Sequence, residues 1–197
     1  MPKVYRHYRV LAEQLSQHVD LDTQRAVLDG LDYLGGSPKP KVRVRWAREA
    51  MERLDTLLDP ETRIRVREGC ACVLSNEKSI YAQSFRKLRK LYRDDDAYLD
   101  EVVKYLNATT PLRRCGEVTR EGDTLYSVIA WGTCGCPVLH EGLHGTLSST
   151  WCHCSKGSLL SVYRYVFPER VCHMEIVRTI AQGAEDCSFA VTYRQEV

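Results

Sequence analysis

The hydrophobic pattern of the chain changes its period once, at about residue 111, and this change constrains the fold more than any other feature of the sequence. Before that point apolar residues recur every three or four positions, for example along 4–19, as on one face of a helix. After it apolar and polar residues alternate, as in a strand with one buried face. The sequence therefore predicts a helical N-terminal half followed by a half that contains a sheet.

The first half contains start and stop signals for several helices. After the helix at 4–19 we expect a short helix at 22–34 and then a turn-rich linker at 35–40. Asp59 followed by Pro60 is typical of a helix start, with Asp as the N-cap and Pro in the first turn. The helices expected after the linker lie at 44–58, 60–69, 77–92 and 96–106.

The second half alternates in a way that predicts two hairpins. The strands 115–120 and 124–131 form the first, and 171–181 and 187–193 form the second. Between them we expect a further strand and a helix, at 147–151 and 157–167. This order predicts an α+β fold, with an antiparallel sheet covered by helices behind a helical N-terminal half. We expect a helical region at 1–109 and a cysteine-rich α+β domain at 110–197, packed as one unit.

Six of the nine cysteines fall into three C-x-C pairs, a repetition that chance does not explain. Thiolates are soft ligands for zinc, iron–sulfur clusters or Cu(I), and a short spacing brings two of them to one ion at little ordering cost. The predicted metal ligands are therefore the members of these pairs, Cys70, Cys72, Cys134, Cys136, Cys152 and Cys154. Zinc is the expected cofactor, and an iron–sulfur cluster is the alternative.

Six thiols exceed the four that a closed zinc site takes, so three possibilities stay open. The pairs form one site with spare cysteines, or they hold a polynuclear cluster, or the spare thiols are reactive. Residues two apart on a helix point away from each other, so Cys70 and Cys72 can both be ligands only if the helix ends near Gly69. The isolated cysteines are expected as small core side chains, and they are Cys115, Cys172 and Cys187. Among them, Cys187 is the first to consider as a ligand.

Histidines and a glutamate follow the second pair in the segment His-Glu-Gly-Leu-His, 140–144. Its spacing resembles the zinc-binding H-E-x-x-H motif, but the glycines at 142 and 145 disfavour the helix that this motif requires. Additional ligands or acid/base groups are expected among His140, Glu141, His144, His153 and Cys187. His7 is expected on the surface of the first helix.

Charge and hydropathy restrict the class of partner. The formal net charge is +2, but the stretch 41–93 holds 14 basic and 7 acidic residues. Because the acidic residues interleave, we interpret the basic ones, among them Arg63, Arg65 and Arg67, as solvated helix faces and do not expect nucleic-acid binding. An anionic small ligand stays open. No apolar run is long enough to span a bilayer or to form a signal peptide, so we expect a cytoplasmic protein with reduced cysteines.

Four motifs of the second half carry a family resemblance. They are Cys134-Gly-Cys-Pro, Trp151-Cys-His-Cys-Ser-Lys-Gly, Val171-Cys-His-Met-Glu and Gly183-Ala-Glu-Asp-Cys-Ser-Phe. Over about 110–197 the chain resembles an uncharacterised prokaryotic cysteine-rich family. It is also similar to the wider family of aminothiazoline-carboxylate hydrolase-like and 4-vinyl-reductase-like domains. The resemblance implies a sensor or hydrolase-like domain with a ligand cavity between sheet and helices. The C-x-C pairs depart from the wider family and favour a metal or thiol role.

Two hypotheses about function follow. The first is a cytoplasmic metal-binding, sensor-like or small-molecule-binding protein that uses its C-x-C thiolate pairs, in which metal would also contribute to folding. The second is a small hydrolase or thiol-dependent enzyme of the aminothiazoline-carboxylate hydrolase-like type. In that enzyme a cysteine would be the nucleophile, or a bound metal would activate water. The catalytic residues stay unassigned.

Overall fold

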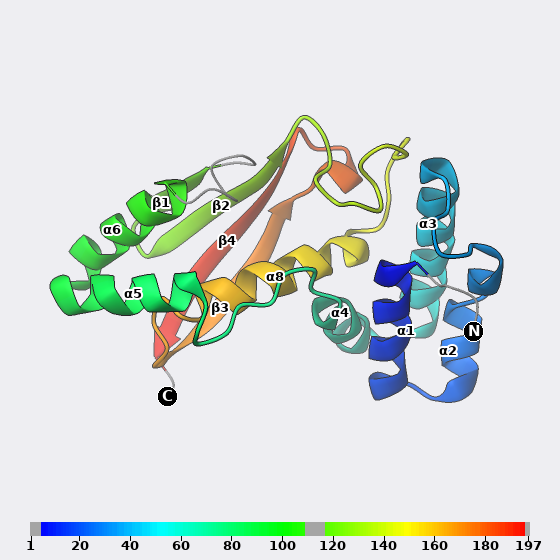
Figure 1. Cartoon of the computed structure of the whole chain (residues 1–197), viewed down its shortest axis with the longest axis horizontal. Coiled ribbons are helices and arrows are strands. Elements are labelled where there is room, and N and C mark those ends of the chain that lie inside the picture. The colour runs from blue at the N-terminus through cyan, green and yellow to red at the C-terminus, as the bar shows by residue number, and fades with distance from the viewer. Residues whose placement is uncertain (1–4, 109–116, 196–197) are drawn as a thin grey trace. The chain divides into compact units, whose positions relative to one another are not determined.

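The computed structural model describes residues 5–108 and 117–195 and confirms the α+β class, with helices and a four-stranded antiparallel sheet (Figure 1). The chain divides into two compact units. Unit 1 comprises 1–72, 134–157 and 181–183, and unit 2 comprises 73–133, 158–180 and 184–197. Both units therefore draw residues from each of the two regions suggested by the sequence.

Unit 1 is built mainly from helices of the N-terminal half. These are α1 (Arg6–His18), α2 (Leu21–Val27), α3 (Pro40–Leu57) and α4 (Pro60–Gly69), with the short 3-10 helix η1 (Leu31–Tyr33). The helix expected at 22–34 is broken, because Gly30 takes a left-handed backbone conformation with φ 77°. The apolar faces of α1 and α3 supply the core of this unit, including Tyr8, Leu11, Leu15, Trp46, Met51 and Leu54.

The segment 134–157 brings loops and the 3-10 helix η2 (Ser149–Cys152) into unit 1, followed by the start of α8 (His153–Tyr163). The prediction of a strand at 147–151 was wrong. The hydroxyl groups of Ser148 and Thr150 both donate to the carboxylate of Asp55 on α3, at 2.5 and 2.6 Å. These two bonds and the Ser148 cap on the backbone N–H of Thr150 stabilise a tight turn here.

Unit 2 contains α5 (Ile80–Leu91), α6 (Asp95–Ala108) and the sheet. Its strands, in spatial order, are β1 (Val118–Glu121), β2 (Thr124–Trp131), β4 (Asp186–Gln195) and β3 (Arg170–Arg178), and all neighbours are antiparallel. Val191 of β4 lies opposite Leu125 on one side and Met174 on the other. The short 3-10 helix η3 (Ile180–Gln182) stands between β3 and β4. The core combines α5, α6, α8 and the sheet, with Phe85, Tyr98, Val102, Tyr163, Phe167 and Phe189 fully buried.

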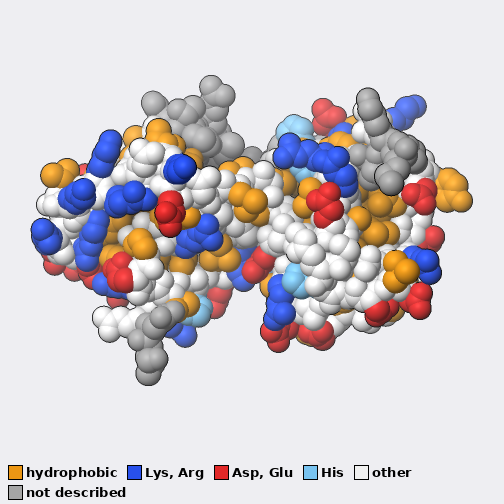
Figure 2. All heavy atoms as spheres, turned by 60° about the horizontal axis from the view of Figure 1, so that its bottom comes forward, with side chains coloured by type: hydrophobic (Ala, Val, Ile, Leu, Met, Phe, Trp, Pro, Cys, Tyr) orange, Lys and Arg blue, Asp and Glu red, His pale blue; other side chains and the backbone are white. Residues whose placement is uncertain are grey.

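Charged side chains cover α5 and the start of α6. Lys and Arg side chains lie among apolar and acidic ones on the left of Figure 2. On α5, the side chains of Arg86, Lys87 and Lys90 are exposed. This interleaving is the one expected from the sequence. In the ranges 5–108 and 117–195, every helix falls short of the length and apolar character that crossing a bilayer requires.

Candidate thiolate centre

All three C-x-C pairs belong to unit 1. The first pair stands where α4 ends, the second in the loop after residue 133, and the third at the junction of η2 and α8. Helix α4 ends at Gly69, and Cys70 is its C-cap. The requirement that the helix end there for both Cys70 and Cys72 to serve is therefore met.

Interactions connect at least four of the six paired thiols. The thiols of Cys72 and Cys154 share a hydrogen bond. Cys154 also interacts electrostatically with Cys70 and Cys136, and Cys72 interacts with Cys136. These interactions connect both members of the first pair with the second member of each other pair. We call Cys70, Cys72, Cys136 and Cys154 the thiol cluster.

A buried guanidinium stands beside the thiol cluster. Arg67 of α4 is 2% exposed, although the sequence placed it on a solvated helix face, so that prediction was wrong. Its Nη2 donates to the carbonyl of Trp151 at 2.7 Å, and its guanidinium lies 4.2 Å from the centre of the Trp151 ring. The groups that act on its charge are all cysteines, among them Cys70, Cys154 and Cys136. A buried cation usually pairs with a carboxylate. Because cysteines act on the charge of Arg67 instead, its guanidinium is suited to stabilise thiolates.

Hydrogen-bond donors also point at two sulfur atoms of the thiol cluster. The indole Nε1–H of Trp151 donates to Cys136 Sγ at 3.4 Å, and the backbone N–H groups of Val138 and Leu139 donate to the same sulfur. The hydroxyl and backbone N–H of Ser155 donate to Cys154. Donors that converge on sulfur stabilise a thiolate more than a thiol.

These surroundings shift the pKa values of the thiols in opposite directions. The hydrogen bond from Cys72 lowers the pKa of Cys154 to about 6, against burial, and Arg67 and Ser155 act in the same sense. That bond, together with burial, raises the pKa of Cys72. Burial raises the pKa of Cys70 and of Cys136. Negative charge is therefore concentrated on Cys154, the member of the pair that is buried.

The other candidates of unit 1 lie around this centre in different roles. Cys134 and Cys152 are buried, and Cys152 acts on the charge of Arg67. The segment 140–144 forms turns and bends, so the helix required by H-E-x-x-H does not form. His140 Nδ1 lies 2.9 Å from the carbonyl oxygen of Cys134, and Glu141 lies 4.0 Å from Arg43.

Two further histidines complete the set. The backbone carbonyl of His144 accepts from Arg48 at 2.7 Å, so its place in the structure is fixed through the main chain. His153 Nδ1 lies 3.8 Å from Glu68 Oε1, which also pairs with Lys156 at 2.7 Å. Neither arrangement places these rings in the thiol cluster.

The remaining cysteines were expected as core side chains. Cys187 is buried in unit 2, where its Sγ accepts from the backbone N–H of Ile180 at 3.4 Å. Cys172 is partly buried in the same unit, and burial raises its pKa to about 12. Cys115 falls outside the described residues.

Sequence reasoning missed two residues of the centre, Arg67 and His7. Arg67 precedes Cys70 by three positions, so on one helix the two share a face, and that spacing was a usable signal. His7 was assigned to the surface, but its Nδ1 lies 3.8 Å from Cys72 Sγ and its ring is half-buried. No local signal marks His7, because α1 and the end of α4 meet only in the tertiary fold.

Within 5–108 and 117–195, no three His, Cys, Asp or Glu side chains are arranged closely enough to hold a metal ion. In the thiol cluster the candidate ligand atoms are thiols that interact with one another, and those of Cys72 and Cys154 share a hydrogen bond. Its donor set nevertheless fits a soft metal, because it offers four thiols, a buried compensating cation and N–H groups directed at sulfur.

The comparison with family models identifies the chain. It belongs to DUF6144, a family of unknown function, whose model matches residues 3–197. No curated protein matches the sequence. The DUF6144 match covers residues of both units. It does not test the similarity to aminothiazoline-carboxylate hydrolase-like domains, which stays a prediction.

Proposed function

We propose that this DUF6144 protein binds a soft metal ion through Cys70, Cys72, Cys136 and Cys154. The observation that supports this proposal is that these four thiols, from three separate C-x-C pairs, interact with one another and with the buried guanidinium of Arg67. Zinc is the first candidate because it takes four thiolates in a closed site, and an iron–sulfur cluster is the alternative. The cytoplasm, where thiols stay reduced, is the compartment that this role requires.

Charge balance supports this assignment. Four thiolates around a divalent cation carry a net charge of −2, which is costly to bury without a compensating group. The guanidinium of Arg67 would offset part of that charge. The N–H donors on Cys136 and Cys154 would orient their sulfur atoms, as groups around metal ligands commonly do.

The test compares two members of one C-x-C pair. Zinc affinity is measured by competition with a chromophoric chelator on anaerobically prepared protein, beside elemental analysis. Cys136→Ser should weaken binding by about a hundredfold or more, because one of four ligands is lost. Cys134→Ser, the matched control from the same loop, should bind as the wild type does. Equal affinity of C136S and wild type, or equal losses in both variants, would refute the four-ligand assignment.

A second candidate function is thiol-dependent catalysis, as in the hydrolase-like alternative. It is favoured by the lowered pKa of Cys154, because a cysteine with a pKa near 6 is a thiolate nucleophile at neutral pH. In metal-free protein the alkylation of Cys154 by iodoacetamide should have its pH midpoint below those of Cys70 and Cys136, as measured by peptide mass spectrometry. Added zinc should block that reaction if the metal proposal holds. Continued reactivity of Cys154 under saturating zinc would favour the enzyme.

A further inference from the structure

Unit 2 contains a cleft that the thiol cluster does not use. It has a volume of about 480 Å³ and lies between α5, the start of α6 and the segment 165–169. Its floor consists of side chains that are almost fully buried, Phe85, Tyr98, Val166 and Ala82. Small-molecule sites have volumes of about 300–1,000 Å³ and a mostly apolar lining, so this cleft has suitable size and character.

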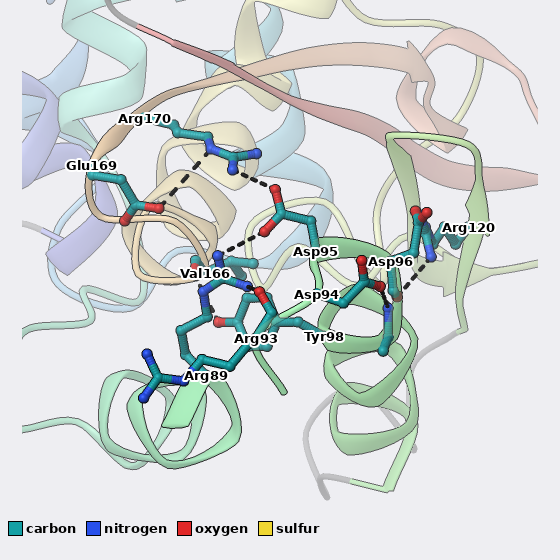
Figure 3. A network of polar contacts seen from close by, with 11 residues as sticks. Arg89, Arg93, Asp94, Asp95, Asp96, Tyr98, Arg120, Val166, Glu169 and Arg170 are labelled. Atoms are coloured by element: carbon teal, nitrogen blue, oxygen red, sulfur yellow. Dashed lines mark hydrogen bonds and ion pairs between the residues drawn. The ribbon is translucent and has the colours of Figure 1, made fainter. Parts of the chain in front are cut away.

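Hydrogen bonds and an ion-pair network hold the cleft in shape. The hydroxyl of Tyr98 donates to the carbonyl of Val166 at 2.7 Å, which links α6 to the segment before β3. Asp95 accepts from Arg89 at 2.7 Å and from Arg170 at 2.5 Å (Figure 3). The Arg89 guanidinium also lies 5.0 Å from the centre of the Tyr98 ring. A site with fixed walls loses little entropy when a ligand binds.

The mouth of the cleft carries charges of both signs. The charge of Arg89 is balanced by Asp95, whereas Arg86 donates to the backbone carbonyl of Glu77 at 3.0 Å and makes no ion pair within the described ranges. Glu77 and Glu169 also line the cleft, and both are exposed. The nearest cation to Glu169 is 4.0 Å away, on Arg170, whose closer partner is Asp95. The cleft therefore brings basic and acidic residues together beside the partly exposed Tyr165.

We propose that this cleft binds a small zwitterion with an aromatic side chain, an amino acid of that class. The ligand carboxylate pairs with Arg86, its ammonium group faces Glu77 and Glu169, and its ring packs on the accessible surface of Tyr165 and Pro168. Each charged group of such a ligand meets an opposite charge, which an uncharged or singly charged ligand would not achieve. This site is independent of the proposed metal function, because every residue that lines it belongs to unit 2.

The test uses L-phenylalanine as the probe and isothermal titration calorimetry as the measurement. Phenylpropionate lacks the ammonium group and phenethylamine lacks the carboxylate, and each should bind about tenfold more weakly than L-phenylalanine. Arg86→Gln should weaken L-phenylalanine and phenylpropionate by about tenfold and leave phenethylamine unchanged. The double variant Glu77→Gln/Glu169→Gln should weaken L-phenylalanine and phenethylamine and leave phenylpropionate unchanged.

Exposed positions make these variants safe for folding, since Arg86, Glu77 and Glu169 all lie at the surface. Lys87→Gln is the matched control, because Lys87 is the exposed neighbour of Arg86 on α5 and does not line the cleft. It should bind all three probes as the wild type does. Absence of saturable L-phenylalanine binding by folded wild-type protein, or equal binding by wild type and R86Q, would overturn the proposal.

Discussion

At the residue scale, Arg67 is the group that distinguishes the thiol centre from a set of buried cysteines. Inert core cysteines need no cation, yet the guanidinium of Arg67 is 2% exposed and interacts with Cys70, Cys136, Cys152 and Cys154. Two contacts with Trp151 hold the guanidinium in place. It donates a hydrogen bond to the Trp151 carbonyl at 2.7 Å, and it lies 4.2 Å from the centre of the Trp151 ring. The residue is thus positioned to favour thiolates on either functional proposal.

Arg67→Met should therefore weaken zinc binding by about ten- to a hundredfold, because it removes the cation that offsets thiolate charge. The same variant should raise the pKa of Cys154, since Arg67 is one of the groups that lower it. Chelator competition measures the affinity, and the pH dependence of iodoacetamide modification measures the pKa. Arg65→Met, on the exposed face of α4, is the control and should change neither quantity. Unchanged zinc affinity in R67M would contradict the role of Arg67.

The pairing of Asp186 with Arg178 should make the stability of the protein depend on pH. Its side chain, 2% exposed, accepts two hydrogen bonds from Arg178, at 2.8 and 2.7 Å, and this pairing lowers its pKa. A lowered pKa in the folded state stabilises the protein above the unfolded pKa of about 3.9. That contribution is lost as the pH falls through the folded value. Asp186→Asn should lower the urea midpoint at pH 7, and its difference from wild type should shrink as the pH falls below about 3.9.

The control for this experiment is Glu185→Gln, a neighbouring carboxylate that is exposed. It should follow the wild-type midpoint at each pH, because its charge is solvated in both states. A constant difference between D186N and wild type from pH 7 to pH 3 would mean that packing, and not charge, gives Asp186 its effect.

At the element scale, the close approach of α8 to α4 decides whether Cys154 can reach the first C-x-C pair. A Cβ atom added to Gly157 would lie 2.2 Å from the backbone carbonyl oxygen of Glu68. Only glycine therefore permits this approach. The C-terminal end of α4 and the start of α8 both carry thiols of the cluster, so the contact positions the site.

Gly157→Ala should destabilise the protein by about 1–3 kcal/mol, despite the higher helix propensity of Ala, because a backbone must move. It should also weaken zinc binding. Urea denaturation and chelator competition measure the two effects. Gly69→Ala is the matched control: its Cβ would meet the flexible end of the Gln14 side chain, which can rotate away. A stability of G157A equal to or above that of G69A would show that the contact is not tight.

The elements themselves were largely predictable, because they depend on local patterns. The strand expected at 124–131 is β2 with the same bounds, and the Asp59 cap starts α4 as expected. The strand expected at 147–151 failed because Asp55, far along the chain, receives the hydroxyl groups of Ser148 and Thr150. Local propensity gives way to such tertiary bonds.

The candidate site was predictable in kind but not in membership. Repeated spacing identified all three C-x-C pairs, and their thiols do lie in one unit. Spacing does not reveal which member of each pair turns toward the others. That depends on where α4 ends and how the loop at 134–139 folds back on Cys136. Arg67 was missed for the same reason, since its burial is a consequence of packing against Trp151.

At the scale of the whole molecule, the proposed metal site would join three separate stretches of the chain within unit 1. A ligand that binds only the folded state stabilises that state. Unit 2 holds none of the four proposed ligands. Metal should therefore stabilise one unit selectively.

Hydrogen–deuterium exchange measured by mass spectrometry tests this selectivity. Added zinc should slow exchange in α4, in the segment 134–142 and at the start of α8, because opening of these elements would break metal–thiolate bonds. Exchange in α6 and β2 of unit 2 should stay the same. Cys136→Ser protein should show no protection by zinc in either unit, whereas Cys134→Ser should behave as the wild type. Protection spread equally over both units, or retained in C136S, would mean that zinc acts elsewhere than at the thiol cluster.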